Sequence, residues 1–462
     1  MLTSQKSELL RNLLGGLPAG TAALLAKAIE NDKRSGGHAL PHDLILGALS
    51  PALTKASVRA PTALRLFSLP FADFLTADKA KEKQKGRIAP ASLRAAWRWL
   101  ARQLAPEAVA VYRAEIAKLA AEGKRDEAYA RAAIFRAFAA REMREAIARD
   151  RKGARAALGG ETALADAAEI ALLLAAGAEI VEAQNLLPRN TPQLSDELLR
   201  ALRDIHDRVA VNVPDAAPYI ACVAMARLAH PWEALKLPQM VARQTQDTLI
   251  ANTDMGLVGD LLFAMIERCG SAVRAARHPS FDVEALIGDL ARFTALSSAI
   301  VKEIEMRRDG VWGKRLLKDR AAVAETMEGL MEHAPREILA MLPVLRTGSF
   351  GGGPKAADFA RPVDEDKAER GLRYARLLSG VAPYAAAGSF GAAHKDALDE
   401  VSKHLRGYNE DVIREIRTED PARRAVVERQ FELAVRTTAL LFSQTEAEFL
   451  ARRAKAALQP AA

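Results

Sequence analysis

Cysteine and histidine, two residue types that often hold zinc, occur twice in the same order in the middle of this chain. Cys222 precedes His230, and Cys269 precedes His278. Within each pair, a separation of roughly eight or nine helical residues puts the side chains about 12–13 Å apart, so neither pair can chelate zinc alone. The simpler interpretation is a small core cysteine and a histidine that ends a helix before proline. We therefore expect no metal site and no cofactor.

A second pattern with catalytic meaning is His206-Asp207, the dipeptide found in all-helical metal phosphohydrolases of the HD type. Those enzymes also need a first histidine on a nearby upstream helix, and no histidine occurs between 43 and 205. Charged neighbours (Arg203, Asp204 and Arg208) surround the dipeptide. We therefore interpret His206 as a surface histidine, and a metal-dependent hydrolase is the third and weakest functional hypothesis.

Cations concentrate in the stretch 59–104. A basic loop carries Lys79, Lys81, Lys83, Lys85 and Arg87, in which Glu82 is the only acid after Asp78. Arg94, Arg98 and Arg102 follow at intervals of four, which places them on one face of a helix. Such a row could contact phosphates, or it could be the solvated flank of an amphipathic helix, which is the commoner situation.

Aromatic residues stand on both sides of the basic loop. Phe67, Phe71 and Phe74 precede it, and Trp97 and Trp99 follow it. We expect Phe67, Phe71, Phe74 and Trp97 to be mostly buried and to fix the two ends of the loop. The loop itself should be exposed, because unpaired ammonium groups are rarely buried. The arrangement suits either a docking surface or a hinge, and the sequence does not choose between them.

The tetrapeptide Gly-Ser-Phe-Gly occurs at 348–351 and again at 388–391. Proline, arginine and lysine recur in the same register around both copies, at Pro343 and Pro383, Arg336 and Arg376, and Lys355 and Lys395. This pattern predicts a duplicated helix–loop unit in which Phe350 and Phe390 plug into neighbouring elements at a helix exit. The alternative is a backbone nest that binds an anion.

The whole composition predicts an all-α, multi-helical array. Half of the residues are hydrophobic and only 5% are aromatic, with strong helix formers in excess. Cys222 and Cys269 are offset by roughly 47 residues, which suggests an α-solenoid-like centre. Glycine at 153–160 and a Gly/Pro-rich loop at 348–366 predict three units, 1–158, 159–346 and 347–462.

In the second of these units, Ser195 is expected to cap a helix whose buried face carries Leu198, Leu202, Ile205 and Val209. Further helices are expected at 216–229, 235–251, 256–268, 283–307 and 319–332.

The last of these units is predicted to end in one long helix reaching about Leu458. A seam along it alternates steps of four and three residues, and 427–449 could therefore pack internally or against a second copy. The seam consists of Phe431, Val435, Thr438, Phe442, Thr445 and Phe449.

Charge, cysteine content and apolar runs limit the cellular compartments in which we expect the protein. The formal net charge is +8, but 66 basic and 58 acidic residues are mixed along the chain. Two cysteines exclude a disulfide framework, and the N-terminal residues contain no continuous apolar run that predicts a signal peptide. The apolar run 170–181 is about half a membrane span and contains Glu179, so it predicts a buried helix. We expect a cytoplasmic protein.

Our leading hypothesis is a non-catalytic scaffold or adaptor that binds protein partners through helix surfaces and the 59–104 segment. The alternative is a nucleic-acid-associated protein using a basic surface at 79–102 and 131–155. The second of these ranges contributes Arg131, Arg136, Arg141, Arg144, Arg149, Arg151 and Arg155.

Overall fold

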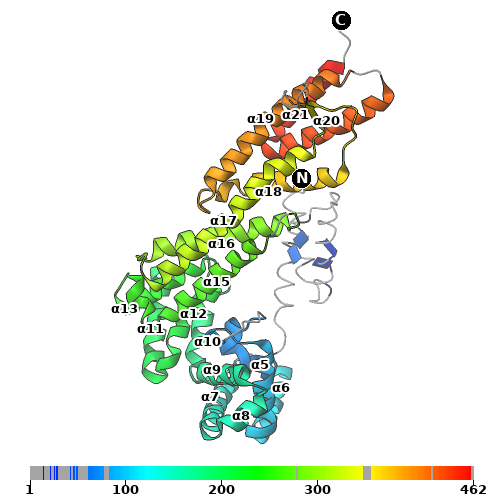
Figure 1. Ribbon diagram of the computed structural model, residues 1–462. Coiled ribbons are helices and arrows are strands. Elements are labelled where there is room, and N and C mark those ends of the chain that lie inside the picture. The colour runs from blue at the N-terminus through cyan, green and yellow to red at the C-terminus, as the bar shows by residue number, and fades with distance from the viewer. Residues whose placement is uncertain are drawn as a thin grey trace. The chain divides into compact units, whose positions relative to one another are not determined.

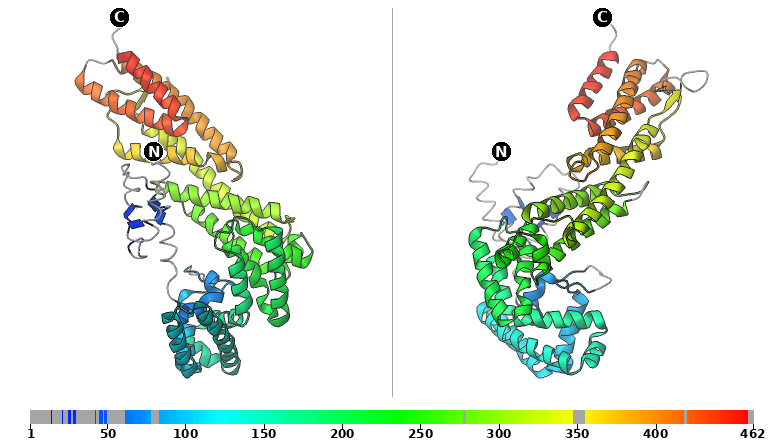
Figure 2. Two further views of the ribbon diagram at one scale, coloured as in Figure 1. Left: turned by 180° about the vertical axis from the view of Figure 1, so that it is seen from behind. Right: turned by 60° about the vertical axis from the view of Figure 1, so that its left-hand side comes forward.

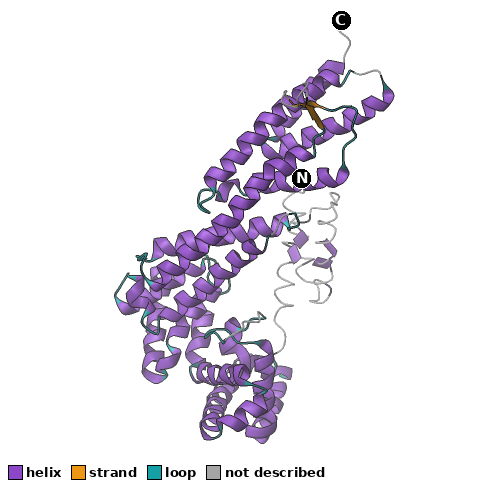
Figure 3. Ribbon diagram, in the orientation of Figure 1, coloured by secondary structure: helices purple, strands orange, loops and turns teal. Residues whose placement is uncertain are grey.

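The computed structural model describes residues 61–77, 83–276, 279–346, 355–417 and 420–458, and scattered positions between Leu14 and Leu49. Helices account for nearly all of the regular structure in these residues, which confirms the all-α prediction (Figures 1 and 3). The two described strands, β1 (Val344–Arg346) and β2 (Lys355–Ala357), form one antiparallel pair that pairs Val344 with Ala357. No helix in this part of the chain combines the length and apolar character needed to cross a bilayer.

The chain divides into two compact units. Unit 1 comprises 1–83 and 88–178, and unit 2 comprises 84–87 and 179–462. The predicted boundary at 158 lies inside unit 1, where helices on both sides of it pack on the same neighbour. The predicted boundary at 346 lies inside unit 2, between the two strands of one hairpin.

Unit 1 is built around its longest helix, α7, which packs against α4, α6, α8 and α9. Asp150 accepts a hydrogen bond from the Gly153 amide at 2.9 Å and so begins α8, and Gly159, at φ 93°, ends it. Leu164, Ile170 and Leu174 of α9 are buried. The helices are α4 (Ala63–Ser68), η1 (Leu69–Phe74), α5 (Pro90–Trp99), η2 (Leu100–Leu104), α6 (Pro106–Ala121), α7 (Arg125–Arg149), α8 (Arg151–Leu158), α9 (Glu161–Ala175) and α10 (Gly177–Leu186), which ends in unit 2.

The first part of unit 2 follows several predicted helix positions. Ser195 caps α11 by accepting a hydrogen bond from the Leu198 amide at 3.3 Å, as predicted, and Leu202, Ile205 and Val209 are buried. The helices are α11 (Asp196–Asn212), η3 (Pro214–Ala216), α12 (Pro218–Arg227), η4 (Pro231–Leu235), α13 (Lys236–Ala242), α14 (Asp247–Ala251), α15 (Gly256–Ala275), α16 (Val283–Glu303) and α17 (Val311–Ala340).

Two predicted helices of this region have different bounds. The predicted helix 235–251 is wrong, because Arg243 takes a left-handed conformation (φ 52°) that separates α13 from α14. The predicted helix 319–332 is part of the longer α17, which continues through Pro335.

The second part of unit 2 is a set of neighbouring helices. α17, α18 (Glu365–Gly380), α19 (Gly391–Glu415), α20 (Pro421–Leu441) and α21 (Gln444–Leu458) run in alternating directions (Figures 1 and 2). η5 (Ala382–Tyr384) lies between α18 and α19. Consecutive members of the set pack together, and α17 also packs against α19.

The predicted long C-terminal helix is wrong. It is broken between α20 and α21, where the Ser443 hydroxyl accepts a hydrogen bond from the Glu446 amide at 3.1 Å and caps α21. Thr438 of the predicted seam packs internally and accepts a hydrogen bond from Asn409 at 3.2 Å, whereas Phe449 is exposed. No continuous seam is therefore presented along one helix.

Candidate functional site

The aromatic residues of the 59–104 stretch form a single frame in unit 1. Phe67, Phe71 and Phe74 are buried as predicted, while Trp97 is only partly buried. The ring centroid of Phe67 lies 5.8 Å from that of Phe71 and 4.8 Å from that of Trp97. Phe135 of α7 completes the frame at 6.3 Å from both Phe67 and Trp97. These contacts hold α4, η1 and α5 in fixed positions on α7.

The two ends of the basic loop meet at its base. Leu75 and Ile88 form an isolated parallel bridge, in which the Ile88 amide donates to the Phe74 carbonyl at 2.8 Å. The Thr76 amide donates in turn to the Ile88 carbonyl at 3.0 Å. Because Ile88 is fully buried, these hydrogen bonds anchor the base of the loop to the core of unit 1.

Lys83 does not have the exposed position that the sequence suggested. Its ammonium group lies 2.7 Å from Oδ1 of Asp166 and also contacts Glu169, both on α9. Asp166 and Glu169 are buried, and the second oxygen of Asp166 accepts from the Ala89 amide at 3.2 Å. Two buried carboxylates need a nearby cation, so Lys83 is a structural residue and not a free binding residue.

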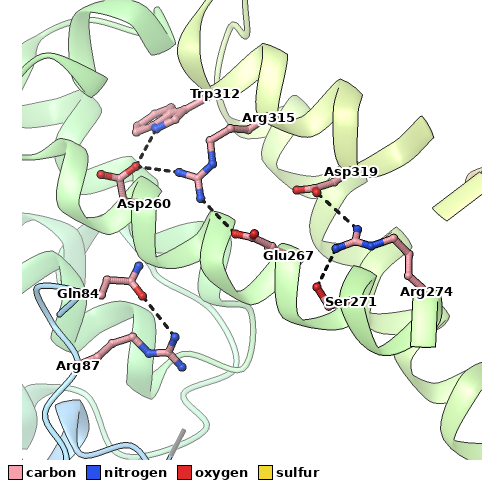
Figure 4. Close-up of polar contacts among 9 residues, drawn as sticks. All are labelled: Gln84, Arg87, Asp260, Glu267, Ser271, Arg274, Trp312, Arg315 and Asp319. Carbon is pink, nitrogen blue, oxygen red and sulfur yellow. Dashed lines mark hydrogen bonds and ion pairs between the residues drawn. The ribbon is translucent and has the colours of Figure 1, made fainter. Parts of the chain in front are cut away.

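The remaining described cations of the basic loop differ in their exposure. Lys85 is exposed, and Arg87 is partly exposed and donates to the Gln84 side chain at 3.3 Å (Figure 4). Both belong to the short piece 84–87 of unit 2, where Gly86 has φ 77° and its backbone lies against Leu261. The left-handed backbone favours glycine at this position, and a side chain there would also have to displace the Leu261 methyl groups. Lys79 and Lys81 lie outside the described residues.

The arginine row (Arg94, Arg98 and Arg102) is exposed. Within the described part of the chain, none of the three forms an ion pair with a carboxylate. The Nε of Arg98 donates to the Arg94 carbonyl at 3.3 Å. Arg102 lies in η2, a π-helical turn closed by a 2.9 Å hydrogen bond from the Ala105 amide to the Leu100 carbonyl. Such turns occur frequently at functional sites.

The arginines of 131–155 do not form one free basic surface. Arg136 is buried and donates to the Leu66 carbonyl at 2.9 Å, and burial lowers its pKa. Arg131 pairs with Glu115 of α6. Arg141 pairs with Glu142 and Glu145, and Arg151 with Glu161. Three exposed arginines of this range form no ion pair with a described residue: Arg144, Arg149 and Arg155.

The histidine and cysteine positions do not assemble into a metal site in the described residues, where no group of three or more potential ligands comes together. His206 is buried, contrary to our expectation, and its Nδ1 lies 3.0 Å from Asp207. Burial alone would raise the pKa of Asp207, but hydrogen bonds from His206 and Arg203 lower it. Cys222 is buried, and burial raises the pKa of Cys269. His278 lies outside the described residues.

The second Gly-Ser-Phe-Gly copy begins a helix and does not end one. Phe390 is buried immediately before α19, and Ser389 takes a left-handed conformation with φ 65°. A side chain at Gly388 would overlap the Phe390 ring. Phe350 lies outside the described residues.

The predicted duplication does not extend to the surrounding structure. Pro343 leads into β1, whereas Pro383 lies in η5. Lys355 belongs to a strand and Lys395 to a helix.

A row of charged side chains joins α15 to α17 (Figure 4). Arg315 lies 3.2 Å from Asp260 and 3.7 Å from Glu267, and Arg274 lies 3.6 Å from Asp319. Burial raises the pKa of Asp319, and the nearby Glu267 raises it further. Since each of these charges has a partner on the facing helix, we interpret the row as a helix-pairing contact. No local sequence pattern indicates this contact, because the partners lie about 45–55 residues apart.

The chain matches no known family, and no match was found among the curated proteins or the solved structures.

Proposed function

We propose that this protein is a non-catalytic, cytoplasmic helical scaffold that binds an acidic segment of a protein partner through α5 and η2. The observation that carries the proposal is the arginine row, which is exposed and forms no ion pair with a described residue. Elsewhere in unit 1, Lys83, Arg131 and Arg151 each have a carboxylate partner.

The geometry of the row suits carboxylates. Arg94 and Arg98 are one helical step of four residues apart, a rise of about 6 Å. Guanidinium groups bind carboxylates through two parallel hydrogen bonds, which favours an acidic side-chain ladder on a partner. The aromatic frame already fixes the helix, so little conformational entropy of the backbone is lost on binding.

The nucleic-acid alternative retains some support from Arg144, Arg149 and Arg155. Its predicted surface is smaller than the sequence suggested, because Lys83 and Arg136 are in structural contacts and Arg131 is neutralised. Duplex binding needs several unpaired cations that follow the phosphates. We therefore rank it second. The hydrolase alternative gains no support from the described residues around His206.

Two finer predictions remain proposals. A repeat-like, α-solenoid arrangement of the centre would suit a scaffold. Self-association through 427–449 would have to use two separate helices, since the predicted seam is broken at Ser443.

Affinity purification from the native host, with and without nuclease, tests the proposal. The bait would be the full chain, a variant with Arg94, Arg98 and Arg102 changed to Ser, and a control variant with Arg144, Arg149 and Arg155 changed to Ser. We expect a nuclease-resistant protein partner that the first variant loses and the control keeps. Nuclease-sensitive capture reduced in both variants would support the nucleic-acid alternative.

A further inference from the structure

A cleft of unit 2 lies between α17, the β1–β2 hairpin and α19. Its volume is about 870 Å³, within the range of known ligand sites. Apolar lining comes from Pro335, Leu339 and Val344, and Val344 is 42% exposed. None of these residues takes part in the proposed function of α5.

The cleft is built from fixed elements. The Asp411 side chain of α19 accepts a hydrogen bond from the Ala357 amide at 3.1 Å and so holds β2 against the helix. The Tyr408 hydroxyl donates to Gln430 at 2.9 Å, away from solvent. The floor therefore exists before any ligand arrives, which lowers the cost of binding.

Because residue 407 is a glycine, no side chain projects from α19 into this part of the cleft. Gly407 lies in the middle of α19 and lines the cleft, and no atom lies within 4 Å of where a side chain would begin. Glycine weakens a helix interior relative to alanine, and here no neighbouring atom requires its small size. A bound backbone that approaches the helix closely would provide a reason for glycine at this position.

The two walls of the cleft carry matching charges. α17 presents Glu332 and then Arg336, and α19 presents Glu400 and then Lys403, and both helices run toward the hairpin. All four side chains are exposed, and none forms an ion pair with a described residue. Each wall therefore changes from acidic to basic in the same direction. Nearer the hairpin the charges are already paired, as in the 2.6 Å contact between Glu410 and Arg453.

We infer that the cleft binds a peptide segment of a protein partner that carries both a basic and an acidic side chain. The acidic side chain lies toward Arg336 and Lys403, and the basic side chain toward Glu332 and Glu400. A small residue on the hairpin side of the acidic side chain passes over Gly407, which follows Lys403 along α19, and Val344 adds apolar contact nearer the hairpin. Complementarity to four unpaired charges and to a flat floor distinguishes this segment from a purely acidic ligand.

The test uses random dodecapeptides displayed on phage and selected on the immobilised full chain. Enriched peptides are synthesised with a fluorophore, and their dissociation constants are measured by anisotropy. We expect the enriched peptides to contain an acidic residue that lies between a basic residue and a small residue. Their affinity should fall about tenfold or more in the double variant R336E/K403E.

Matched variants separate binding from folding. Gly407→Gln should raise the melting temperature and weaken peptide binding. Gly329 is an equally open glycine of α17 outside the cleft, so Gly329→Gln should raise the melting temperature without affecting peptide binding. K318E/K395E, which reverses exposed lysines on the same helices, should leave binding unchanged.

Failure to enrich any peptide, enriched peptides without both charges, or equal binding to G407Q and G329Q would overturn the inference. Replacement of the arginine row of α5 by Ser should leave peptide binding intact, so failure of the proposed function is distinguishable from failure of the cleft.

Discussion

The ammonium nitrogen of Lys83 lies 2.7 Å from a carboxylate oxygen of Asp166, although the two residues are far apart in the sequence. The contact divides the basic stretch into two kinds of cation. Lys83 neutralises buried carboxylates of α9, whereas Lys85 and the arginine row are exposed. Charge density in the sequence alone does not distinguish these roles.

Loss of the Lys83 contact should destabilise unit 1. We expect Lys83→Met to lower the free energy of unfolding by about 3 kcal/mol, since Asp166 and Glu169 would remain buried without a cation. Lys85→Met is the matched control and should change it by less than about 0.5 kcal/mol. Denaturant titration measures both. Equal, small effects would show that water already compensates the two carboxylates.

The packing of Phe390 gives a second prediction. Phe390→Ala should lower the free energy of unfolding by about 3–5 kcal/mol, because it removes a fully buried ring. Ser389→Ala, one residue earlier, should change stability little. Thermal and denaturant unfolding provide the comparison. A Phe390→Ala variant that unfolds like the parent would contradict the buried position at the start of α19.

The sequence predicted some features and missed others for identifiable reasons. Helix content, the Ser195 cap and the buried rings of Phe67 and Phe71 follow from local pattern. The partners of Lys83 and the burial of Arg136 depend on contacts between distant segments. The break at Ser443 was missed because its neighbours continue a helical pattern and a capping serine is also tolerated inside helices.

The candidate site was predicted only in part. Arg94, Arg98 and Arg102 are all exposed, but the π-helical turn that carries Arg102 left no recognisable signal in the sequence. The cleft in unit 2 could not be found at all, because its walls come from α17 and α19, which pack side by side only in the folded unit. A role for Gly407 can be inferred only from its position in the cleft, which the sequence does not show.

The raised pKa of Asp319 predicts a pH dependence. A carboxyl whose pKa is higher in the folded state favours folding while it is protonated and disfavours it as it ionises. The melting temperature of Asp319→Asn relative to the parent should therefore increase as pH rises from about 4 to 7.

Asp364 is the control, because its pKa is shifted in the opposite direction to that of Asp319. Hydrogen bonds from the Lys367 side chain and amide lower its pKa. Its stabilising contribution to folding is therefore present at pH values above the ordinary carboxyl pKa and is lost as pH falls. Asp364→Asn should become less stable relative to the parent as pH rises through the same range. Parallel curves for the two variants would contradict these assignments.

Gly407 gives a prediction about stability alone. Gly407→Ala should raise the free energy of unfolding by up to about 1 kcal/mol, because alanine is the better helix former and nothing obstructs its side chain. Gly329→Ala should have a similar effect. Denaturant titration of both variants is the measurement. Destabilisation by Gly407→Ala would mean that this position is packed.

The proposed binding role of α5 and η2 is tested most directly by the dissociation constant of the captured protein partner. It should be measured for the full chain and for both triple arginine-to-serine variants under one salt condition. We expect the Arg94, Arg98 and Arg102 variant to bind about tenfold to a hundredfold more weakly, since three charge-assisted contacts are lost. The Arg144, Arg149 and Arg155 variant should bind like the parent. Equal affinity of both variants for the partner would contradict the account.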